Sequence, residues 1–257
     1  MPTVSLLTDF GLQDEFVGVM HGVILRINPA ARVVDLCHAV PPGDRQRAAY
    51  LWAWSYRYFP PRTVHVAVVD PGVGTARRIL CAEAHGQYFL APDNGMLTLV
   101  LREARRPVVY EVRASRYWLR PVSATFHGRD ILAPVAAHLS RGITPRVLGP
   151  RTTMWEQLSL PPVRRQGRLW YGAVVDIDRF GNLVTNVGAE VLAQVGRPAF
   201  RVRRRRMGLV RTYQGVRRGG VAAMVGSRGL VEIAVRDGSA AQLLRACVGD
   251  RVTLAAR

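Results

Sequence analysis

The chain has 257 residues, of which 49% are apolar, and a mean hydropathy of +0.05, values typical of a folded protein with a substantial core. No long uninterrupted apolar run and no basic segment before an apolar run is present, so we expect no membrane span or signal peptide and a cytoplasmic protein. The net charge of +18 comes from 36 basic residues that are all arginine, and the absence of lysine excludes Schiff-base, P-loop and lysine-base chemistry.

Residues 1–155 alternate β-rich runs with helical patterns, which predicts an α/β domain with a largely parallel sheet. Apolar residues recur every three or four positions from Phe16 to Ile27, and Asn28-Pro29 ends that helix. The run 63–69 is nearly continuous in apolar residues, as in a buried central strand. We expect strands at 3–8, 32–36, 63–69, 79–83 and 87–91, and helices at 16–27, 44–54 and 130–139, the last capped by Asp130.

The pattern changes beyond residue 155. A Pro- and Arg-containing stretch at 156–167 is expected to be a linker, and short β-type runs follow it at close spacing. These runs predict a smaller, all-β, barrel-like domain over 168–257. We expect strands at 169–177, 183–187, 199–202, 220–225, 230–235 and 251–254, and one short helix at 239–245.

Cysteine and histidine give no sign of a metal site. Cys37, Cys81 and Cys247 are far apart and form no CxxC pair, so reduced and mostly buried thiols are expected. The six histidines have no ligand spacing. We therefore predict neither a bound metal nor a cofactor.

The surplus of arginine has two explanations. It can be an electrostatic footprint for nucleic acid, or it can follow from a genome whose codon bias replaces lysine by arginine. Arginine occurs along the whole chain, and the densest run, residues 201–206, contains no interleaved aromatic residue. These features favour the compositional explanation, and we do not expect nucleic acid as a partner.

Three polar segments of the first domain are candidates for chemistry. Asp9 follows the first strand, where it can bind a ribose diol or cap the next helix. Asp70 follows the most buried strand, and the Pro-Gly turn after it either shapes a ligand site or only reverses the chain. His127 lies beside Gly128 and Arg129 at a helix start, a setting that favours proton handling over a structural role.

Two further segments lie in the second domain. The run from Asp178 to Asn182 is either a hairpin turn or a group that presents a carboxylate, an aromatic face and an amide together. The run from Gly226 to Gly229 is either a tight turn or a hydroxyl and guanidinium pair that holds a carboxylate. Neither motif is decisive alone.

Taken together and in order, the motifs are specific. They are TDFG at 8–11, TVHVAVVDPGVGT at 63–75, APDNG at 91–95, TFHGRDILAPVAAHL at 125–139, DRFGN at 178–182 and SRG at 227–229. The sequence resembles the S-adenosylmethionine (SAM) hydroxide adenosyltransferase family from about Val4 to Leu254. That resemblance implies an α/β domain followed by a β-barrel. It also implies homotrimers whose active sites lie between subunits, and cleavage of SAM by water to adenosine and methionine.

The resemblance also implies roles for individual residues. It assigns Asp70, Arg77 and His127 to the activation of water, with either Asp70 or His127 as the proton acceptor. Asp9 would bind the ribose, supported by Asp14. The remaining implied substrate contacts are Asp178, Ser227 and Arg228 for the methionine end and Phe180, Asn182, Asp237 and Gly238 for the adenine side.

Rival functions differ at identifiable positions. The halogenating relatives carry a small hydroxyl residue where this chain has Gly128, and an aromatic residue near the position of Gly43, so both departures favour water over halide. Arg62 stands where relatives usually have glycine. A SAM or adenosine sensor without turnover, or a polyanion-binding protein that keeps only the fold, are the alternatives from other classes.

Overall fold

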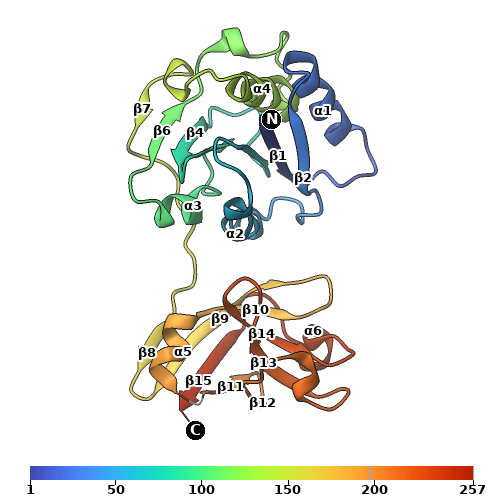
Figure 1. The fold of residues 1–257 in the computed structure, drawn as a ribbon, viewed down its shortest axis with the longest axis vertical. Helices are drawn as coiled ribbons and strands as arrows, with labels where there is room; N and C mark the ends of the chain where they lie inside the picture. Colours follow the sequence, from blue (N-terminus) through green and yellow to red (C-terminus); the bar gives the residue numbers. More distant parts are fainter. Residues whose placement is uncertain (197, 257) are drawn as a thin grey trace. The chain divides into compact units, whose positions relative to one another are not determined.

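The computed structural model describes residues 1–196 and 198–256, which fall into two compact units, 1–158 and 159–257 (Figure 1). Within these described residues, no helix is long and apolar enough to cross a membrane. The first unit contains β1 (Thr3–Thr8), α1 (Phe16–Ile27), β2 (Arg32–Cys37), α2 (Arg45–Ser55), β3 (Val64–Val68), β4 (Ile79–Ala84), β5 (Gln87–Pro92), α3 (Thr98–Glu103), β6 (Val108–Glu111), α4 (Ala133–Ser140) and β7 (Arg151–Thr152).

The sheet of the first unit is mixed, with the order β2-β1-β3-β5-β4-β6-β7. Strands β2, β1, β3 and β5 are parallel, whereas β4, β6 and β7 pair antiparallel, so the expectation of a largely parallel sheet was correct for one half only. The reason is the two-residue turn of His85 and Gly86, both with positive φ, between β4 and β5. Such a turn can join only antiparallel strands, because a parallel crossover needs a dozen residues or more.

Helices cover both faces of this sheet (Figure 1). Helices α1 and α4 pack on one face through Met20, Ile24 and Val135. Helices α2 and α3 pack on the other, where the fully buried Trp52 meets the edge of Phe89 at 5.4 Å between ring centroids. Alternate residues of β1 and β3 serve the two faces, which is why these strands are apolar at nearly every position.

The helix expected at 130–139 begins differently. A π-helical turn at Gly128–Leu132 precedes α4, and Pro134 lies in the first turn of α4. The prediction from sequence that Asp130 caps this helix was wrong: Asp130 is buried and lies inside the π-helical turn. It accepts a hydrogen bond from the Ser123 backbone N–H at 2.8 Å and pairs with Arg129, because a charged donor stabilises a buried carboxylate more than a neutral one.

The second unit is an antiparallel barrel with small helices. Its elements are β8 (Arg164–Gln166), β9 (Leu169–Ile177), β10 (Leu183–Gly188), α5 (Ala189–Val195), β11 (Pro198–Val202), β12 (Arg205–Gly208), β13 (Val221–Val225), β14 (Leu230–Val235), α6 (Ala240–Leu244) and β15 (Arg251–Ala256). The strand order is β12-β11-β15-β9-β10-β14-β13, with β8 added to β9. A bridge between Leu209 and Ala223 links the two ends of this order, which makes the sheet nearly closed.

Three elements of the second unit were not expected from sequence. Helix α5 was missed, β8 falls within the segment expected as a linker, and β12 lies in the arginine run. The core holds apolar residues from both sides of the barrel, among them Val174, Leu183, Phe200, Ile233 and Leu254.

The cysteines and the backbone show two local departures from expectation. All three cysteines are free, but only Cys81 is buried, whereas Cys37 is half-buried and Cys247 is exposed. Arg62, in the turn before β3, has φ = +65°, a conformation that favours glycine. Its backbone N–H donates to Gly86 O at 2.8 Å, so the turn keeps its hydrogen bond.

Candidate active site

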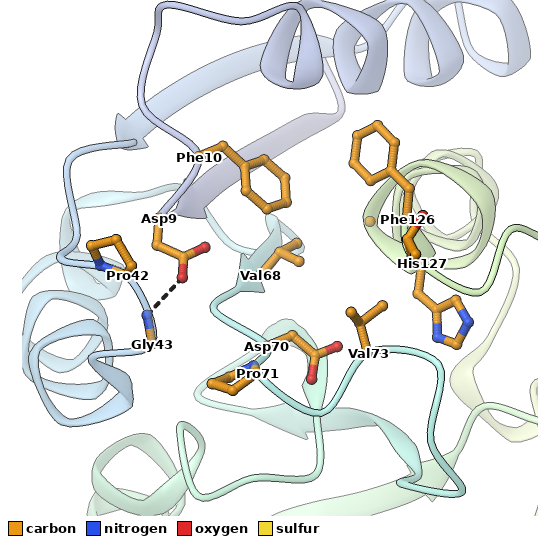
Figure 2. Close-up of a pocket in the computed structure, with 12 residues that line it drawn as sticks. Asp9, Phe10, Pro42, Gly43, Val68, Asp70, Pro71, Val73, Phe126 and His127 are labelled. Atoms are coloured by element: carbon orange, nitrogen blue, oxygen red, sulfur yellow. Dashed lines mark hydrogen bonds between the residues drawn. The ribbon is translucent and has the colours of Figure 1, made fainter.

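A cavity of about 410 Å³ lies at the carboxyl ends of β1 and β3 (Figure 2). The register pairs Thr8 with Val68, so the chain leaves both strands at the same edge of the sheet. Ligands bind at this edge in open α/β sheets. The lining consists of Asp9, Phe10, Pro42, Gly43, Val68, Asp70, Pro71, Val73, Thr125, Phe126, His127 and Gly128.

A backbone N–H group fixes the position of the Asp9 carboxylate in this cavity. Its Oδ2 accepts a hydrogen bond from the Gly43 N–H at 2.9 Å, and Figure 2 shows this bond on the wall opposite His127. Asp9 does not cap α1, whose N-cap is Glu15, so the capping alternative does not apply. Its other oxygen Oδ1 takes part in no hydrogen bond with the described residues, which leaves it available to a hydroxyl of a ligand.

Asp70, Arg77 and His127 meet although 57 residues separate the first from the last. Arg77 Nε donates to both oxygens of Asp70 at 2.7 Å, and Arg77 Nη2 donates to Asp70 Oδ2 as well. Arg77 Nη2 also donates to His127 Nδ1 at 2.9 Å. The side chains of Asp70 and Arg77 are only 4% and 10% exposed, so this charged group is shielded from water.

The contact with Arg77 determines the state of His127. A guanidinium can only donate, so Nδ1 must accept, and the neutral ring then carries its proton on Nε2. Partial burial and the charge of Arg77 lower the pKa of His127, while Asp70 and Asp130 act in the opposite direction. His127 is therefore neutral at pH 7 and offers an N–H donor, not a free acceptor.

A polar chain that sequence reasoning missed supports the loop after β1. Thr8 Oγ1 accepts from the Phe10 N–H at 3.2 Å and lies 2.8 Å from His38 Nδ1. His38 O in turn accepts from the Gly11 N–H at 2.8 Å, and His38 Nε2 lies 3.0 Å from Asp35 Oδ1. This buried histidine thus fixes the turn that carries Asp9. The sequence signal for this role is weak: His38 directly follows β2, and Thr8 ends the neighbouring strand β1.

In the second unit, Asp178 organises a tight turn. Its Oδ1 accepts from the N–H groups of Phe180 and Asn182, each at 2.9 Å, and its Oδ2 accepts from Asn182 Nδ2 at 2.9 Å. Gly181 has φ = +81°, and a Cβ at this position would lie 2.1 Å from Ser239 Oγ. Both the hairpin-turn and the functional interpretations of this motif are therefore compatible with the geometry.

The Gly226–Gly229 turn lies beside a group of acidic side chains. Arg228 Nη1 donates to the buried Asp176 at 3.4 Å, while Ser227 is exposed. The carboxylate of Glu232, a residue that is 7% exposed, accepts no hydrogen bond from the residues that the structure describes, and a Cβ at Gly226 would meet this carboxylate. Burial raises the pKa of Glu232, Arg228 opposes that rise, and Asp178 adds to it. Glu232 was not identified from sequence.

A second cavity, of about 490 Å³, belongs to the second unit alone. It is lined by Phe180, Asn182, Tyr213, Val235, Asp237 and Gly238. Phe180 is 76% exposed and Tyr213 is 46% exposed, so two aromatic side chains are accessible at this cavity. Tyr213 was missed from sequence, because it lies in an irregular segment with no motif around it.

The predicted residues therefore divide between the two units. The structure brings together Asp9, Asp70 and His127 at one cavity, with Arg77 bonded behind them, and brings Phe180, Asn182, Asp237 and Gly238 together at the other. Asp14 is exposed and lines neither cavity. Across residues 1–196 and 198–256, no group of three His, Cys, Asp or Glu residues is placed to hold a metal ion.

Comparison with models of known protein families identifies the family of this chain. The model of the SAM hydroxide adenosyltransferase N-terminal domain matches residues 4–149, and that of the C-terminal domain matches residues 172–253. The chain belongs to the SAM hydroxide adenosyltransferase family. The resemblance proposed from the sequence motifs is thereby confirmed, and the boundary between the two family domains falls where the structure divides.

Relatives within the SAM hydroxide adenosyltransferase family are similar over nearly the whole chain. A protein of Salinispora tropica named (R)-S-adenosyl-L-methionine hydrolase is 41% identical over 99% of this chain and 98% of its own length. A protein of the same name from Thermus thermophilus is 42% identical over 95% of this chain and 96% of its own length. A fluorinase of an Actinoplanes species is 28% identical, with 76% and 74% covered. A Thermotoga maritima protein of solved structure, described as uncharacterized, superposes with a TM-score of 0.93 at 35% identity, with 98% and 99% covered.

Proposed function

We propose that this chain hydrolyses S-adenosyl-L-methionine, giving adenosine and L-methionine. The observation that carries the proposal is the Asp70–Arg77–His127 group, which is fully assembled at a cavity that Asp9 also lines. The names of the hydrolase relatives add that the substrate is the epimer with R configuration at sulfur. The sequence motifs alone did not indicate that epimer.

In this reaction, a water oxygen attacks C5′ of the ribose from the side opposite the sulfonium. The C5′–O bond forms as the C5′–S bond breaks, and the electron pair leaves with sulfur, which becomes the neutral thioether of methionine. The water loses one proton. A sulfonium is an activated leaving group, so positioning and partial deprotonation of water are the main tasks of the protein.

We propose Asp70 as the proton acceptor, and two features of the geometry support this choice. Neutral His127 has its Nδ1 occupied by Arg77, so its Nε2–H can orient the water oxygen but cannot take a proton from it. Among the described residues, only the Arg77 Nε–H donates to Asp70 Oδ1, which leaves this oxygen a lone pair. Arg77 would hold both partners in place. His127 and Arg77 also line a neighbouring cavity of about 480 Å³, which offers the proton a route to solvent.

Two glycines support water over halide. A Cβ at Gly128 would lie 3.2 Å from the Phe126 ring and 3.4 Å from the Met20 sulfur, so a hydroxyl side chain there would need both neighbours to shift. Gly43 has φ = +75°, which an aromatic residue adopts only under strain, and its N–H is engaged by Asp9. The halogenase alternative is therefore not our proposal.

Asp9 is proposed to bind the ribose hydroxyls. For the methionine end we retain Asp178, Ser227 and Arg228, and add Glu232, because Asp178 already accepts three hydrogen bonds within its own turn. Asp176, Asp178 and Glu232 place three carboxylates near the Arg228 guanidinium, and their negative charge favours an ammonium group. Phe180 and Tyr213, with Asn182, Asp237 and Gly238, would hold the adenine.

We further propose a homotrimer in which the first unit of one subunit and the second unit of the next form each active site. The resemblance to the family supports this assembly. Mixing two variants tests it: Asp70→Asn and Arg228→Ala, each inactive alone, should regain partial activity after subunit exchange. Without shared sites, the mixture would stay as inactive as its components. The expectation of a cytoplasmic location remains a prediction.

The decisive experiment incubates purified protein with each sulfonium epimer of SAM and follows nucleosides by chromatography. We expect adenosine and methionine, faster from the R epimer, and a rate that is indifferent to high chloride. A 5′-halo-adenosine would contradict the assignment of Gly128 and Gly43. Bound SAM or adenosine without turnover would instead favour a sensor.

A further inference from the structure

The positive charge of this chain is concentrated in its second unit. Residues 159–257 contain 18 arginines and 6 acidic residues, whereas residues 1–158 contain 18 arginines and 12 acidic residues. The smaller unit therefore has twice the net charge of the larger one. Arginine makes up a larger share of the second unit, 18 of 99 residues against 18 of 158, without a matching rise in acidic residues, so a bias that acts evenly along the chain does not account for the distribution.

The fold gathers part of this charge on one sheet face. Arg164 on β8 pairs with Tyr171 on β9, and Tyr171 pairs with Thr253 on β15. Thr253 pairs with Arg201 on β11, which pairs with Arg206 on β12. Directly opposed residues of antiparallel strands share a face, so these five residues form one row across five strands. The row spans about 19 Å at the usual strand spacing.

We name this surface the arginine face, defined by Arg164, Tyr171, Arg201, Arg206, Arg251 and Thr253. Arg251 belongs to it because it lies two residues before Thr253 on β15, and its guanidinium lies 5.4 Å from the centre of the Tyr171 ring. The next residues along the strands, such as Phe200 and Leu254, point into the barrel core. The four arginines of the face are all exposed.

These arginines lack anionic partners within the described part of the chain. One cavity on the face, of about 470 Å³, is lined by Arg164, Arg165 and Arg251 together with Gln166 and Tyr171. A smaller one, of about 220 Å³, includes Arg201 and Arg206. No acidic side chain that the structure describes lines either cavity, and none forms an ion pair with the four arginines of the face. By contrast, Arg77, Arg78, Arg113 and Arg129 of the first unit are all paired.

Tyr171 adds the aromatic surface that the arginine run lacks in sequence. The run at 201–206 has no aromatic residue among its arginines, but the pairing of β9 with β15 places Tyr171 in the same row. Guanidiniums without an anionic partner beside an aromatic ring on a sheet are the combination that contacts phosphates and stacks bases in single strands. Guanidinium also matches phosphate in a bidentate geometry.

We propose that the arginine face binds single-stranded nucleic acid, RNA or DNA, mainly through its phosphates. A lipid surface fits less well, since none of the large exposed apolar side chains described in the second unit lines either cavity of the face. A duplex fits less well, because its paired and stacked bases are not free to stack on Tyr171. This second binding activity does not depend on the proposed hydrolysis.

The test measures fluorescence anisotropy of a labelled 20-nucleotide single strand with the full-length protein over a series of salt concentrations. The face variant is Arg164→Ala/Arg201→Ala/Arg206→Ala/Arg251→Ala. The matched control removes the same charge from exposed arginines of the first unit: Arg26→Ala/Arg105→Ala/Arg106→Ala/Arg146→Ala. Both variants should retain the circular dichroism spectrum and SAM turnover of the native chain.

We expect the native chain to bind with a Kd on the order of 1–100 μM at physiological salt, as sequence-independent binding does. The face variant should bind at least about 30-fold more weakly, and its slope of log K against log salt should fall by about 3, near 0.7 for each lost phosphate contact. The control should change the Kd by less than about threefold. Equal loss in both variants would show a general charge effect and overturn the proposal, as would tighter binding to a duplex or to anionic vesicles.

A measurement without substitutions guards against a variant that fails to fold. A strand that contains 4-thiouridine is photo-cross-linked to the native chain, and the modified peptides are identified by mass spectrometry. Cross-links within β8, β9, β11, β12 or β15 support the proposal. Cross-links confined to other segments overturn it.

Discussion

The two units hold their polar groups in different ways. In the first unit, Asp70, Arg77 and His127 come from distant segments and are fixed to one another by charge-assisted hydrogen bonds. In the second, Asp178 and Asn182 are fixed within one five-residue turn, by backbone geometry that depends on Gly181. The first site should therefore be sensitive to loss of charge, and the second to changes in backbone conformation.

The largest effect should follow from removing one charge of the first unit. Asp70→Asn keeps the shape of the side chain but removes the proposed proton acceptor, so we expect kcat to fall by about 10³-fold, within the usual range for general-base catalysis. KM should change little, because the binding groups remain. Steady-state kinetics measure both constants, and circular dichroism verifies the fold. Undiminished turnover would contradict the assignment of Asp70.

Acid should affect the stability of the two units in opposite directions. All six histidines lie in the first unit, and burial lowers the pKa of His65 to about 4. His65 is protonated more readily in the unfolded chain than in the native state. The free energy of unfolding of the first unit therefore falls as the pH drops from about 6.5 toward 4, by on the order of 2 kcal/mol at pH 5. In the second unit, the raised pKa of Glu232 means that its ionised form opposes folding, so mild acid should stabilise that unit.

Hydrogen exchange followed by mass spectrometry at pH 7 and pH 5 resolves this contrast, after correction for intrinsic rates. Protection should fall in β1, β3 and β5 and rise or hold in β10 and β14. The variant His65→Gln should flatten the pH dependence of the first unit, whatever its effect on absolute stability. A parallel loss of protection in both units would contradict the expectation.

The smallest of these effects concerns the turn of the second unit. Gly181→Ala introduces a Cβ that collides with Ser239 and strains a positive φ, so the Asp178 turn should deform. We expect KM for SAM to rise about tenfold with little change in kcat, which corresponds to a loss of about 1.4 kcal/mol in binding. Gly167→Ala is the matched control, since Gly167 has φ = +60° in open space. Similar KM values for both variants would show that the turn does not contribute to binding.

Sequence reasoning located most strands and helices because their apolar periodicity is strong, as in α1 and β3. It missed α5, whose seven residues are too few for a helical period to emerge between two strands. It treated the sheet as largely parallel because it did not use the two-residue His85–Gly86 turn. Long, regular elements are thus predictable, whereas strand direction depends on short turns.

The candidate site was predictable to a lesser degree. Asp70, Arg77 and His127 entered through resemblance, and no spacing in the sequence predicts that Arg77 would bond to both of the others. Glu232 alternates with buried apolar residues along β14 and so resembles a solvent-facing strand residue. Its burial follows from the contacts of the folded barrel, which periodicity does not report.

The turn at Arg62 bears on the history of this arginine-rich chain. A non-glycine residue at φ = +65° costs about 1 kcal/mol or more relative to glycine. Glycine codons (GGN) become arginine codons (CGN) by one base change, so a drift toward arginine can enter such turns at little mutational distance and leave strain behind. Arg62→Gly should therefore raise the thermal midpoint by a few degrees, measurable by calorimetry. Where an arginine occupies a turn of this kind, a single base change to a glycine codon should therefore stabilise the folded chain.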